Sequence, residues 1–310
     1  SDQFAIVSAV SVFAPAKLNL FLAVTGRRTD GFHDLLSVAA QLDFGDTLEV
    51  EPAGSFSLAC DDPALPVDES NLVLRATRAF VAATGWRGGA RLLLRKRVPI
   101  GAGLGGGSSD AVATLRALNS LAGQPLGLPA LREIAAQLGS DCPLFLSDGP
   151  VVIRGRGERV ESLPAGAGSR LRGRRVLIFK PGFGVATAWA YAQVDAAAAG
   201  RRVRPTDPKG GAYVPGPEAE SRLASWTQDP DPGLDALLFN NMERFVFAKY
   251  AALPALLAEL YTECGLTARM SGSGSACYSL LGDDEDAAPV VEVIKRAWGG
   301  SSFVKECRLT

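Results

Sequence analysis

The chain has 310 residues, 47% of them hydrophobic, and its 32 Lys and Arg nearly balance its 33 Asp and Glu. This length and apolar content are enough for two domains. The net charge of -1 gives no general attraction to nucleic acid or to anionic lipid, so we expect neither nucleic acid nor a membrane as a partner and favour a small molecule.

The cysteines and the single histidine exclude several kinds of site. The five cysteines never form a Cys-x-x-Cys pair, which argues against a zinc ribbon or a thioredoxin-type site. An odd number of cysteines in a long chain also argues against a disulfide framework, so we expect reduced thiols and a cytoplasmic protein. No run approaches the roughly 18 apolar residues that span a bilayer. Because His33 is the only histidine, multi-histidine metal sites and the catalytic loop of protein kinases are excluded, and we expect no protein-held metal centre.

The first third of the chain predicts strands and one helix. Apolar, β-branched runs predict strands over 6–13 and 18–24, and residues 46–51 alternate as a third strand. Helical spacing of apolar residues predicts a helix between Glu69 and Gly85, with Ser70 as its cap and Gly85 as its end. Residues 91–98 then predict a strand that leads into a glycine-rich loop.

Residues 99–109 read Pro-Ile-Gly-Ala-Gly-Leu-Gly-Gly-Gly-Ser-Ser, and an apolar stripe predicts a helix directly after them that ends at Gly123. A helix over 128–138 and a strand over 151–153 follow, and residues 164–173 have the loose composition of a domain connection. The second half predicts a strand and several helices, namely a strand over 175–179 and helices over 187–199, near 234–250 and over 253–264. Residues 200–217 are basic and rich in Pro and Gly, so we interpret them as a mobile insertion.

The loop over 99–109 has the composition of an anion-binding site. Five glycines within seven residues let backbone N–H groups converge, and Ser108 stands where it could cap the next helix, whose positive end favours phosphate. The letters Gly101-x-Gly103-x-x-Gly106 match the dinucleotide fingerprint, but no acidic residue lies between Asp110 and Glu133, where that fingerprint needs one. A Walker A loop is excluded because the chain has no Gly-Lys pair. A di- or triphosphate is the favoured ligand, and a glycine hinge without ligand is the alternative.

Three motifs in order resemble those of the GHMP kinases, the family of galactokinase and of homoserine, mevalonate and phosphomevalonate kinases. They are Pro15-Ala-Lys-Leu-Asn-Leu20, the loop over 99–109 and Ser271-Gly-Ser-Gly-Ser-Ala-Cys277. The resemblance implies a two-domain α+β fold, with an ATP-binding and catalytic domain over 1–165, a ferredoxin-like C-terminal domain over 166–310, and the active site in the cleft between them. It also implies an ATP-dependent small-molecule kinase that works with Mg²⁺ and phosphorylates an alcohol group.

Further stretches resemble one branch of that family, namely Asp30-Gly-Phe-His33, Leu42-Asp-Phe-Gly-Asp46, Glu69-Ser-Asn-Leu72 and Leu138-Gly-Ser-Asp-Cys-Pro143. The substrate implied is a cytidyl diphosphate compound of the non-mevalonate isoprenoid precursor pathway. The alternatives are another GHMP kinase, of the mevalonate or homoserine type, and a catalytically inactive ligand-binding regulator. We expect a monomer or a weak homodimer.

The resemblance assigns catalysis to Asp141 and Lys17. The Asp141 carboxylate accepts the proton of the attacking hydroxyl or orients that hydroxyl, and a Lys17 ammonium beside it keeps the carboxylate ionised and balances developing charge. Lys17 sits in an otherwise apolar strand, where an unpaired ammonium is costly, so an acidic or phosphate partner is expected. Asn19 faces the same side at strand spacing.

Substrate and nucleotide contacts come from the resemblance alone. Phe32 and Tyr191 would sandwich the cytosine ring, with core packing as their alternative role, while His33 holds the polar edge of the base and Thr187 lines the same pocket. Asn19, on the same side of its strand as Lys17, is a candidate hydrogen-bond partner of the substrate. The nucleotide would be held by Asn71, Lys96, Pro99, Ile100, Gly101, Ala102, Gly103, Leu104, Gly105, Gly106, Gly107, Ser108 and Ser109. Ser108 and Ser109 are also the candidate Mg²⁺ contacts, and Ser271 to Ser275 would support the loop.

Overall fold

The computed structural model describes residues 9–201 and 211–310, so the start of the strand predicted over 6–13 and residues 202–210 of the predicted insertion lie outside the described residues. The chain forms two compact units. Unit 1 comprises Ser1–Ala16, Phe44–Val98 and Gly105–Ser147, and unit 2 comprises Lys17–Asp43, Pro99–Leu104 and Asp148–Thr310. The domain boundary predicted at residue 165 stays a prediction.

Two long neighbouring strands, β1 (Val10–Arg27) and β2 (His33–Ala53), contribute residues to both units. The two strands predicted over 6–13 and 18–24 therefore belong to one continuous strand from Val10 onward. Its first four residues alternate between half-buried and exposed, whereas Ala16–Val24 is buried throughout. An unbroken buried stretch of this kind is typical of a strand covered on both faces.

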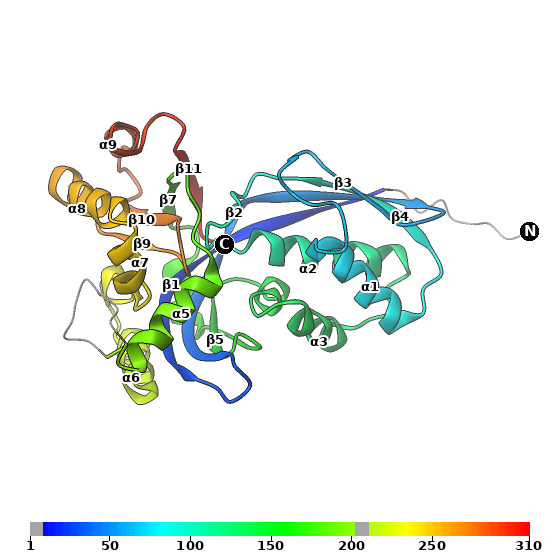
Figure 1. Cartoon of the computed structure of the whole chain (residues 1–310), viewed down its shortest axis with the longest axis horizontal. Helices are drawn as coiled ribbons and strands as arrows, with labels where there is room; N and C mark the ends of the chain where they lie inside the picture. The colour runs from blue at the N-terminus through cyan, green and yellow to red at the C-terminus, as the bar shows by residue number, and fades with distance from the viewer. Residues whose placement is uncertain (1–8, 202–210) are drawn as a thin grey trace, which may run out of the picture. The chain divides into compact units, whose positions relative to one another are not determined.

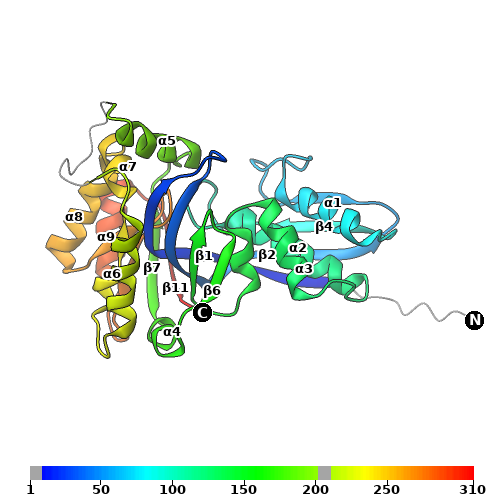
Figure 2. The same ribbon diagram turned by 90° about the horizontal axis from the view of Figure 1, so that it is seen from below.

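Unit 1 packs helices on one face of a small sheet. The far half of β2 pairs antiparallel with β4 (Gly89–Arg95), which pairs parallel with β3 (Ser57–Cys60). Figure 1 shows the helices on one side of these strands, and Figure 2, which looks from below, agrees. These helices are α1 (Leu72–Thr84), α2 (Gly106–Leu121), α3 (Leu128–Leu138) and the short 3₁₀ helix η1 (Cys142–Leu146).

The first helix of unit 1 corrects one prediction. Helix α1 ends as predicted at Gly85, whose φ of 65° is the left-handed conformation that glycine adopts most easily. Its N-cap is Asn71 rather than Ser70, because the Asn71 Oδ1 accepts a hydrogen bond of 2.9 Å from the N–H of Val73. The Ser70 hydroxyl instead donates to Asp68.

Unit 2 contains a four-stranded antiparallel sheet in the order β11-β7-β10-β9. Its strands are β7 (Arg175–Lys180), β9 (Ala268–Met270), β10 (Cys277–Leu281) and β11 (Phe303–Arg308). Helix α8 (Ala252–Cys264) lies between β7 and β9 in the chain, and α9 (Ala288–Trp298) lies between β10 and β11. Strand order 4-1-3-2 with these two crossover helices is the ferredoxin-like arrangement, which confirms that implication of the resemblance.

The core of this sheet explains why α8 and α9 form where they do. Leu253, Leu256 and Leu260 recur at helical spacing along α8 and are buried in one apolar cluster with Phe179 of β7 and Ile294 of α9. Each such side chain contributes about 1.5–3 kcal/mol when it is fully buried. No single described helix is long and apolar enough to cross a membrane, and α8 passes that test only jointly with α7 (Glu243–Lys249), to which it is bent by 109°.

The remaining elements of unit 2 include two further corrections. Residues predicted as a loose connection form α4 (Ala165–Leu171), and the helix predicted near 234–250 is broken into the turn η2 (Leu234–Ala236), the short strand β8 (Phe239–Asn240) and α7. Strand β8 pairs parallel with β1, and β5 (Val151–Gly155) joins β2 to β6 (Arg159–Ser162). Helices α5 (Thr187–Ala198) and α6 (Gly216–Gln228) complete the unit, and α6 begins within the segment 200–217.

Candidate active site

The second half of the glycine loop forms the start of α2 in unit 1. Gly105 is the N-cap, with a φ of 72° and no side-chain cap, so the prediction that Ser108 caps this helix is wrong. Gly106, Gly107 and Ser108 are the first residues of the helix, whose N–H groups have no partner within it. Backbone N–H groups at the positive end of a 16-residue helix are therefore presented to an anion.

The first half of the glycine loop lies in unit 2 against the second glycine loop. Ser271 Oγ donates to Gly103 O at 3.1 Å, and Ala276 N donates to Ala102 O at 3.0 Å. Gly103 has a φ of 75°, and a Cβ there would lie 2.2 Å from Ser271 O. The loop at 271–275 thus holds the first loop in place, as predicted, and only glycine fits at position 103.

Lys17 and Asn19 lie side by side on β1, as strand spacing predicted. Both are buried, at 3% and 6% exposed, and the Lys17 Nζ donates to the Asn19 Oδ1 at 2.5 Å. The Asn19 Nδ2 donates to Ser37 Oγ at 2.9 Å, and the Lys17 N–H donates to Leu104 O at 2.9 Å. A desolvated ammonium is thereby fixed at the glycine loop within unit 2.

Asp141 lies in the turn that joins α3 to η1, and this turn is next to the start of α2 in unit 1. The hydroxyl of Ser108 hydrogen-bonds to the Cys142 thiol, whose pKa burial raises to about 12. A Cβ at Gly139 would lie 3.3 Å from the Cys142 Sγ and 3.8 Å from the same hydroxyl, so this turn packs closely against the start of α2. Asp141 therefore adjoins the helix end that presents the free N–H groups.

Lys96 occupies a place that the resemblance did not predict. Its Nζ lies between Asp46 and Asp110, donating to the Asp110 Oδ2 at 2.8 Å and to the Asp46 Oδ2. Burial alone would lower the pKa of Lys96, but the two carboxylates raise it. Burial raises the pKa of Asp110 to about 7, against the pull of Lys96. The Lys96 ammonium thus links the start of α2, through Asp110, to strand β2, through Asp46.

Two buried oxygens beside this network have no hydrogen-bond partner among residues 9–201 and 211–310. They are the hydroxyl Oγ of Ser109 and the Oδ1 of Asp110. Both lie in the first two turns of α2, where Ser109 was predicted to meet phosphate or Mg²⁺. Asn71, in contrast, uses both polar atoms of its side chain locally, since its Nδ2 donates to Pro66 O at 2.7 Å.

Four of the predicted substrate residues of unit 2 lie at the turn between β1 and β2 or on α5, namely Phe32, His33, Thr187 and Tyr191. The ring of His33 stacks on Tyr191, with centroids 4.6 Å apart and an angle of 28°. Phe32 is 47% exposed and lies under the Arg156 guanidinium at 4.9 Å. Thr187, the first residue of α5, shares a hydrogen bond of 2.9 Å with Ser273 of the second glycine loop.

Sequence reasoning missed the acidic residues that hold two of the predicted basic groups. Asp46 and Asp110 flank Lys96, and Asp195 on α5 contacts the His33 Nε2 at 2.6 Å. Asp195 lies four residues after Tyr191, so helical spacing alone could have paired these two residues on one face of α5. No spacing rule links Asp46 to Lys96, which is 50 positions later.

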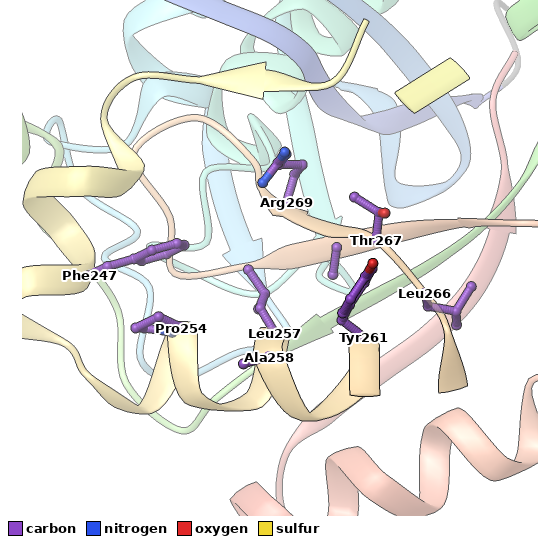
Figure 3. A pocket seen from close by; sticks show the side chains of 9 residues that line it. Phe247, Pro254, Leu257, Ala258, Tyr261, Leu266, Thr267 and Arg269 are labelled. Atoms are coloured by element: carbon purple, nitrogen blue, oxygen red, sulfur yellow. The ribbon is translucent and has the colours of Figure 1, made fainter. Parts of the chain in front are cut away.

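A separate pocket of about 360 Å³ lies on unit 2 and is shown in Figure 3. It is lined by residues of α7, α8 and β9, among them Phe247, Leu257, Tyr261 and Arg269. None of the predicted site residues lines it. Its lining offers the hydroxyls of Tyr261 and Thr267 and the Arg269 guanidinium, but no carboxylate or imidazole that could take a proton from a hydroxyl.

Comparison with protein families agrees with the fold and the loop. Residues 71–149 match the family described as GHMP kinases N terminal domain, and residues 229–300 match GHMP kinases C terminal. A solved homoserine kinase from Cytophaga hutchinsonii superposes with a TM-score of 0.72 at 17% identity, covering 100% of this chain and 97% of that chain, which shows the shared fold. The chain belongs to the GHMP kinase family.

Relatives of higher identity belong to one branch of that family. A 4-diphosphocytidyl-2-C-methyl-D-erythritol kinase from Synechococcus sp. (strain CC9902) is 38% identical, covering 93% of this chain and 94% of the relative. The enzyme of that name from Salinibacter ruber is 37% identical over 91% and 93% of the two chains. A crystal structure of 4-(cytidine 5'-diphospho)-2C-methyl-D-erythritol kinase superposes with a TM-score of 0.73 at 33% identity, covering 97% of this chain and 100% of that chain. Within the GHMP kinases, the chain groups with the 4-diphosphocytidyl-2-C-methyl-D-erythritol kinases.

Proposed function

We propose that this protein transfers the γ-phosphoryl group of ATP to the 2-hydroxyl of 4-diphosphocytidyl-2-C-methyl-D-erythritol, a step of the non-mevalonate isoprenoid precursor pathway. The observation that carries the proposal is the match over nearly the whole chain to kinases of that name. The glycine loop, the buried Lys17 and the placement of Asp141 beside α2 supply groups that such a transfer requires.

We propose that the start of α2 holds the ATP phosphates. The N–H groups of Gly106, Gly107 and Ser108 stabilise negative charge there, and the helix dipole adds to the effect. Lys96 and its two carboxylates act beneath this turn, which supports a role in holding the loop's shape rather than in direct charge pairing with phosphate.

Mg²⁺ fits the oxygens at this turn. The unpartnered Ser109 hydroxyl and Asp110 Oδ1 are oxygen donors of the kind that Mg²⁺ prefers. No group of three or more His, Cys, Asp or Glu in the described part of the chain could hold a metal ion alone, so the ATP phosphates supply the other ligands. When bound, the ion neutralises charge on the phosphates.

We assign the proton of the attacking hydroxyl to Asp141, which accepts it or orients the hydroxyl toward the phosphorus. Lys17 stabilises charge on the transferred group. Asn19 supports Lys17, since its Oδ1 accepts from the ammonium while its Nδ2 is held by Ser37. Loose transfer of this kind depends mainly on positioning and charge balance, and both groups serve those ends.

The cytidyl part of the substrate is assigned to the residues around the turn between β1 and β2. Exposed Phe32 offers a ring face for stacking, and Tyr191 lies against His33. Thr187 would line the same pocket. The five cysteines are all free thiols, which supports the proposed cytoplasmic location, and we propose a monomer or a weak homodimer.

The test is ADP release with Mg·ATP and a panel of 4-diphosphocytidyl-2-C-methyl-D-erythritol, mevalonate, homoserine and galactose. Turnover with the cytidyl compound alone is expected. Turnover with another member would replace the substrate but keep the kinase, and ATP binding without any turnover would favour a regulator.

The catalytic assignment is tested by Asp141→Asn. This variant should keep ATP binding and lose at least about 10³-fold in kcat, because the base and the charge balance are lost together. Asp148→Asn, just after η1, is the matched control and should stay near wild type. Equal activity of the two variants would contradict the role of Asp141.

A further inference from the structure

His33, the only histidine of the chain, is held from two sides within unit 2. Its side chain is 11% exposed, its ring stacks on Tyr191, and its Nε2 lies 2.6 Å from the Asp195 Oδ1. Tyr191 and Asp195 are four residues apart on α5, so one helix face supplies both contacts. The ring therefore has a fixed plane and a fixed partner on one nitrogen.

Asp195 is the centre of a small polar cluster. Tyr213 donates its hydroxyl to the Asp195 Oδ1 at 2.7 Å, and the Arg27 Nη1 lies 3.5 Å from the Oδ2. Burial alone would raise the pKa of Asp195, but hydrogen bonds from His33 and Tyr213 and the charge of Arg27 lower it. Burial and the bond to Asp195 raise the pKa of Tyr213 to about 12, so its hydroxyl stays a donor. Asp195 is thus a carboxylate at neutral pH.

An ionised carboxylate can only accept hydrogen bonds. The short contact to Asp195 therefore requires the proton of the imidazole to be on Nε2. In a neutral imidazole, the Nδ1 of His33 is then an acceptor, and among the described residues it has no side-chain partner. Nε2 is therefore the donor and is bonded to Asp195, whereas Nδ1 remains an acceptor.

We infer that Asp195, assisted by Tyr213, is a positioning residue for base recognition: it fixes the proton of His33 on Nε2 and leaves Nδ1 as an acceptor that selects a base with an amino group on its edge. The inference rests on the proposed function, in which His33 holds the edge of the base. Cytosine carries a 4-amino donor at this edge, whereas uracil carries an oxygen acceptor. An acceptor facing an acceptor leaves both unpaired, so a site of this kind disfavours the uridyl compound.

The first test reads the tautomer directly and needs no substrate. Because the chain has one histidine, the ¹⁵N resonances of its imidazole belong to His33 without further assignment, once any purification tag is removed. The wild type should show a protonated Nε2 and an unprotonated Nδ1. Asp195→Asn should change this to a mixture, because an amide can donate as well as accept. A wild type protonated on Nδ1, or a variant with an unchanged tautomer, would overturn the inference.

The second test measures turnover with the cytidyl substrate and its uridyl analogue. Asp195→Asn should raise the KM of the cytidyl substrate by about 10- to 100-fold, leave the KM of ATP within about twofold, and reduce the preference for cytidyl over uridyl. Tyr213→Phe should do the same more weakly. Asp284→Asn and Tyr261→Phe are the matched controls, at exposed positions of the same unit, and should change neither KM.

The outcomes separate this inference from the proposed function. If the wild type does not phosphorylate the cytidyl compound, the proposed function fails, and the ¹⁵N spectrum still decides the tautomer. If the wild type phosphorylates it and Asp195→Asn keeps the same KM and the same selectivity, only the positioning role fails. A rise in both KM values together would mean that Asp195 stabilises the unit rather than the base site.

Discussion

The Asp46 carboxylate offers the sharpest test of how the glycine loop is held in unit 1. Asp46 is fully buried, and its Oδ1 accepts from the backbone N–H groups of Arg97 at 2.5 Å and Val98 at 2.8 Å, while its Oδ2 accepts from Lys96. Asp46→Asn preserves the shape of the side chain but replaces one acceptor with an NH₂ donor. In either orientation of the amide, that donor faces another donor.

The size of the effect follows from this geometry. The loss of one of the two carboxylates that pair with the buried Lys96 ammonium, together with a buried donor that faces another donor, costs about 3–5 kcal/mol. For a chain of 310 residues the entropy of unfolding is about 0.65 kcal/mol/K, so Tm should fall by about 5–8 °C if the chain unfolds as one. The Lys96 ammonium would keep Asp110 as its one carboxylate partner.

Thermal unfolding of Asp46→Asn beside Glu49→Gln measures this cost. Glu49 lies on the same strand, and its carboxylate pairs with Arg95 at 2.8 Å, but at 38% exposure the pair is solvated and contributes little to stability. Glu49→Gln should therefore lower Tm by no more than about 1.5 °C. Similar small shifts in both variants would refute the view that the buried network holds this region.

Three further outcomes are expected. Burial raises the pKa of Glu243 to about 7, above its ordinary value of 4.5, so the native protein keeps a proton that the unfolded chain has released. The free energy of unfolding should therefore fall as the pH rises from about 5 to 8. Urea titrations should show a smaller fall for Glu243→Gln. An unchanged slope would contradict this. Gly103→Ala should lose at least about 100-fold in kcat/KM for ATP, because its Cβ would collide with Ser271 O, whereas Gly26→Ala meets no atom within 4 Å and should stay active. Asn71→Ala should lower the free energy of unfolding by about 1 kcal/mol, because it removes the N-cap of α1. An equal loss in Ser70→Ala would contradict the assignment of the cap to Asn71.

Local rules predicted the parts of the fold that are set by local residues. Helix α3 was predicted over its observed range, Leu128–Leu138, because glycines flank an amphipathic run. Helix α4 was missed since its sequence is Gly- and Ala-rich and its stability comes from burying Ala167 and Leu171 against the rest of unit 2. Helix α6 was missed because Pro and Gly before it suggested a loop, although Pro at a helix start is favourable.

The same distinction applies to the candidate site. Strand alternation predicted that Lys17 and Asn19 share one face, and the structure confirms their contact. The partners of Lys96 and His33 could not be predicted, because Asp46 and Asp195 are brought to them by sheet pairing and by the docking of α5. The burial of these two carboxylates could not be predicted either, since a sequence shows which residues are charged but not which of them are removed from water.

The position of β11 sets a limit on when unit 2 can form during synthesis. Strand β7 needs β11 along one edge, and Leu309 bridges back to Leu42 of β2. About 120 residues separate β7 from β11, so at about 5–20 residues per second the ribosome needs roughly 6–25 s to supply the missing edge. For that time β7 exposes an unpaired, apolar strand edge of the kind that other chains can capture. Nascent chains stalled before residue 303 should therefore depend on chaperones far more than the finished protein does.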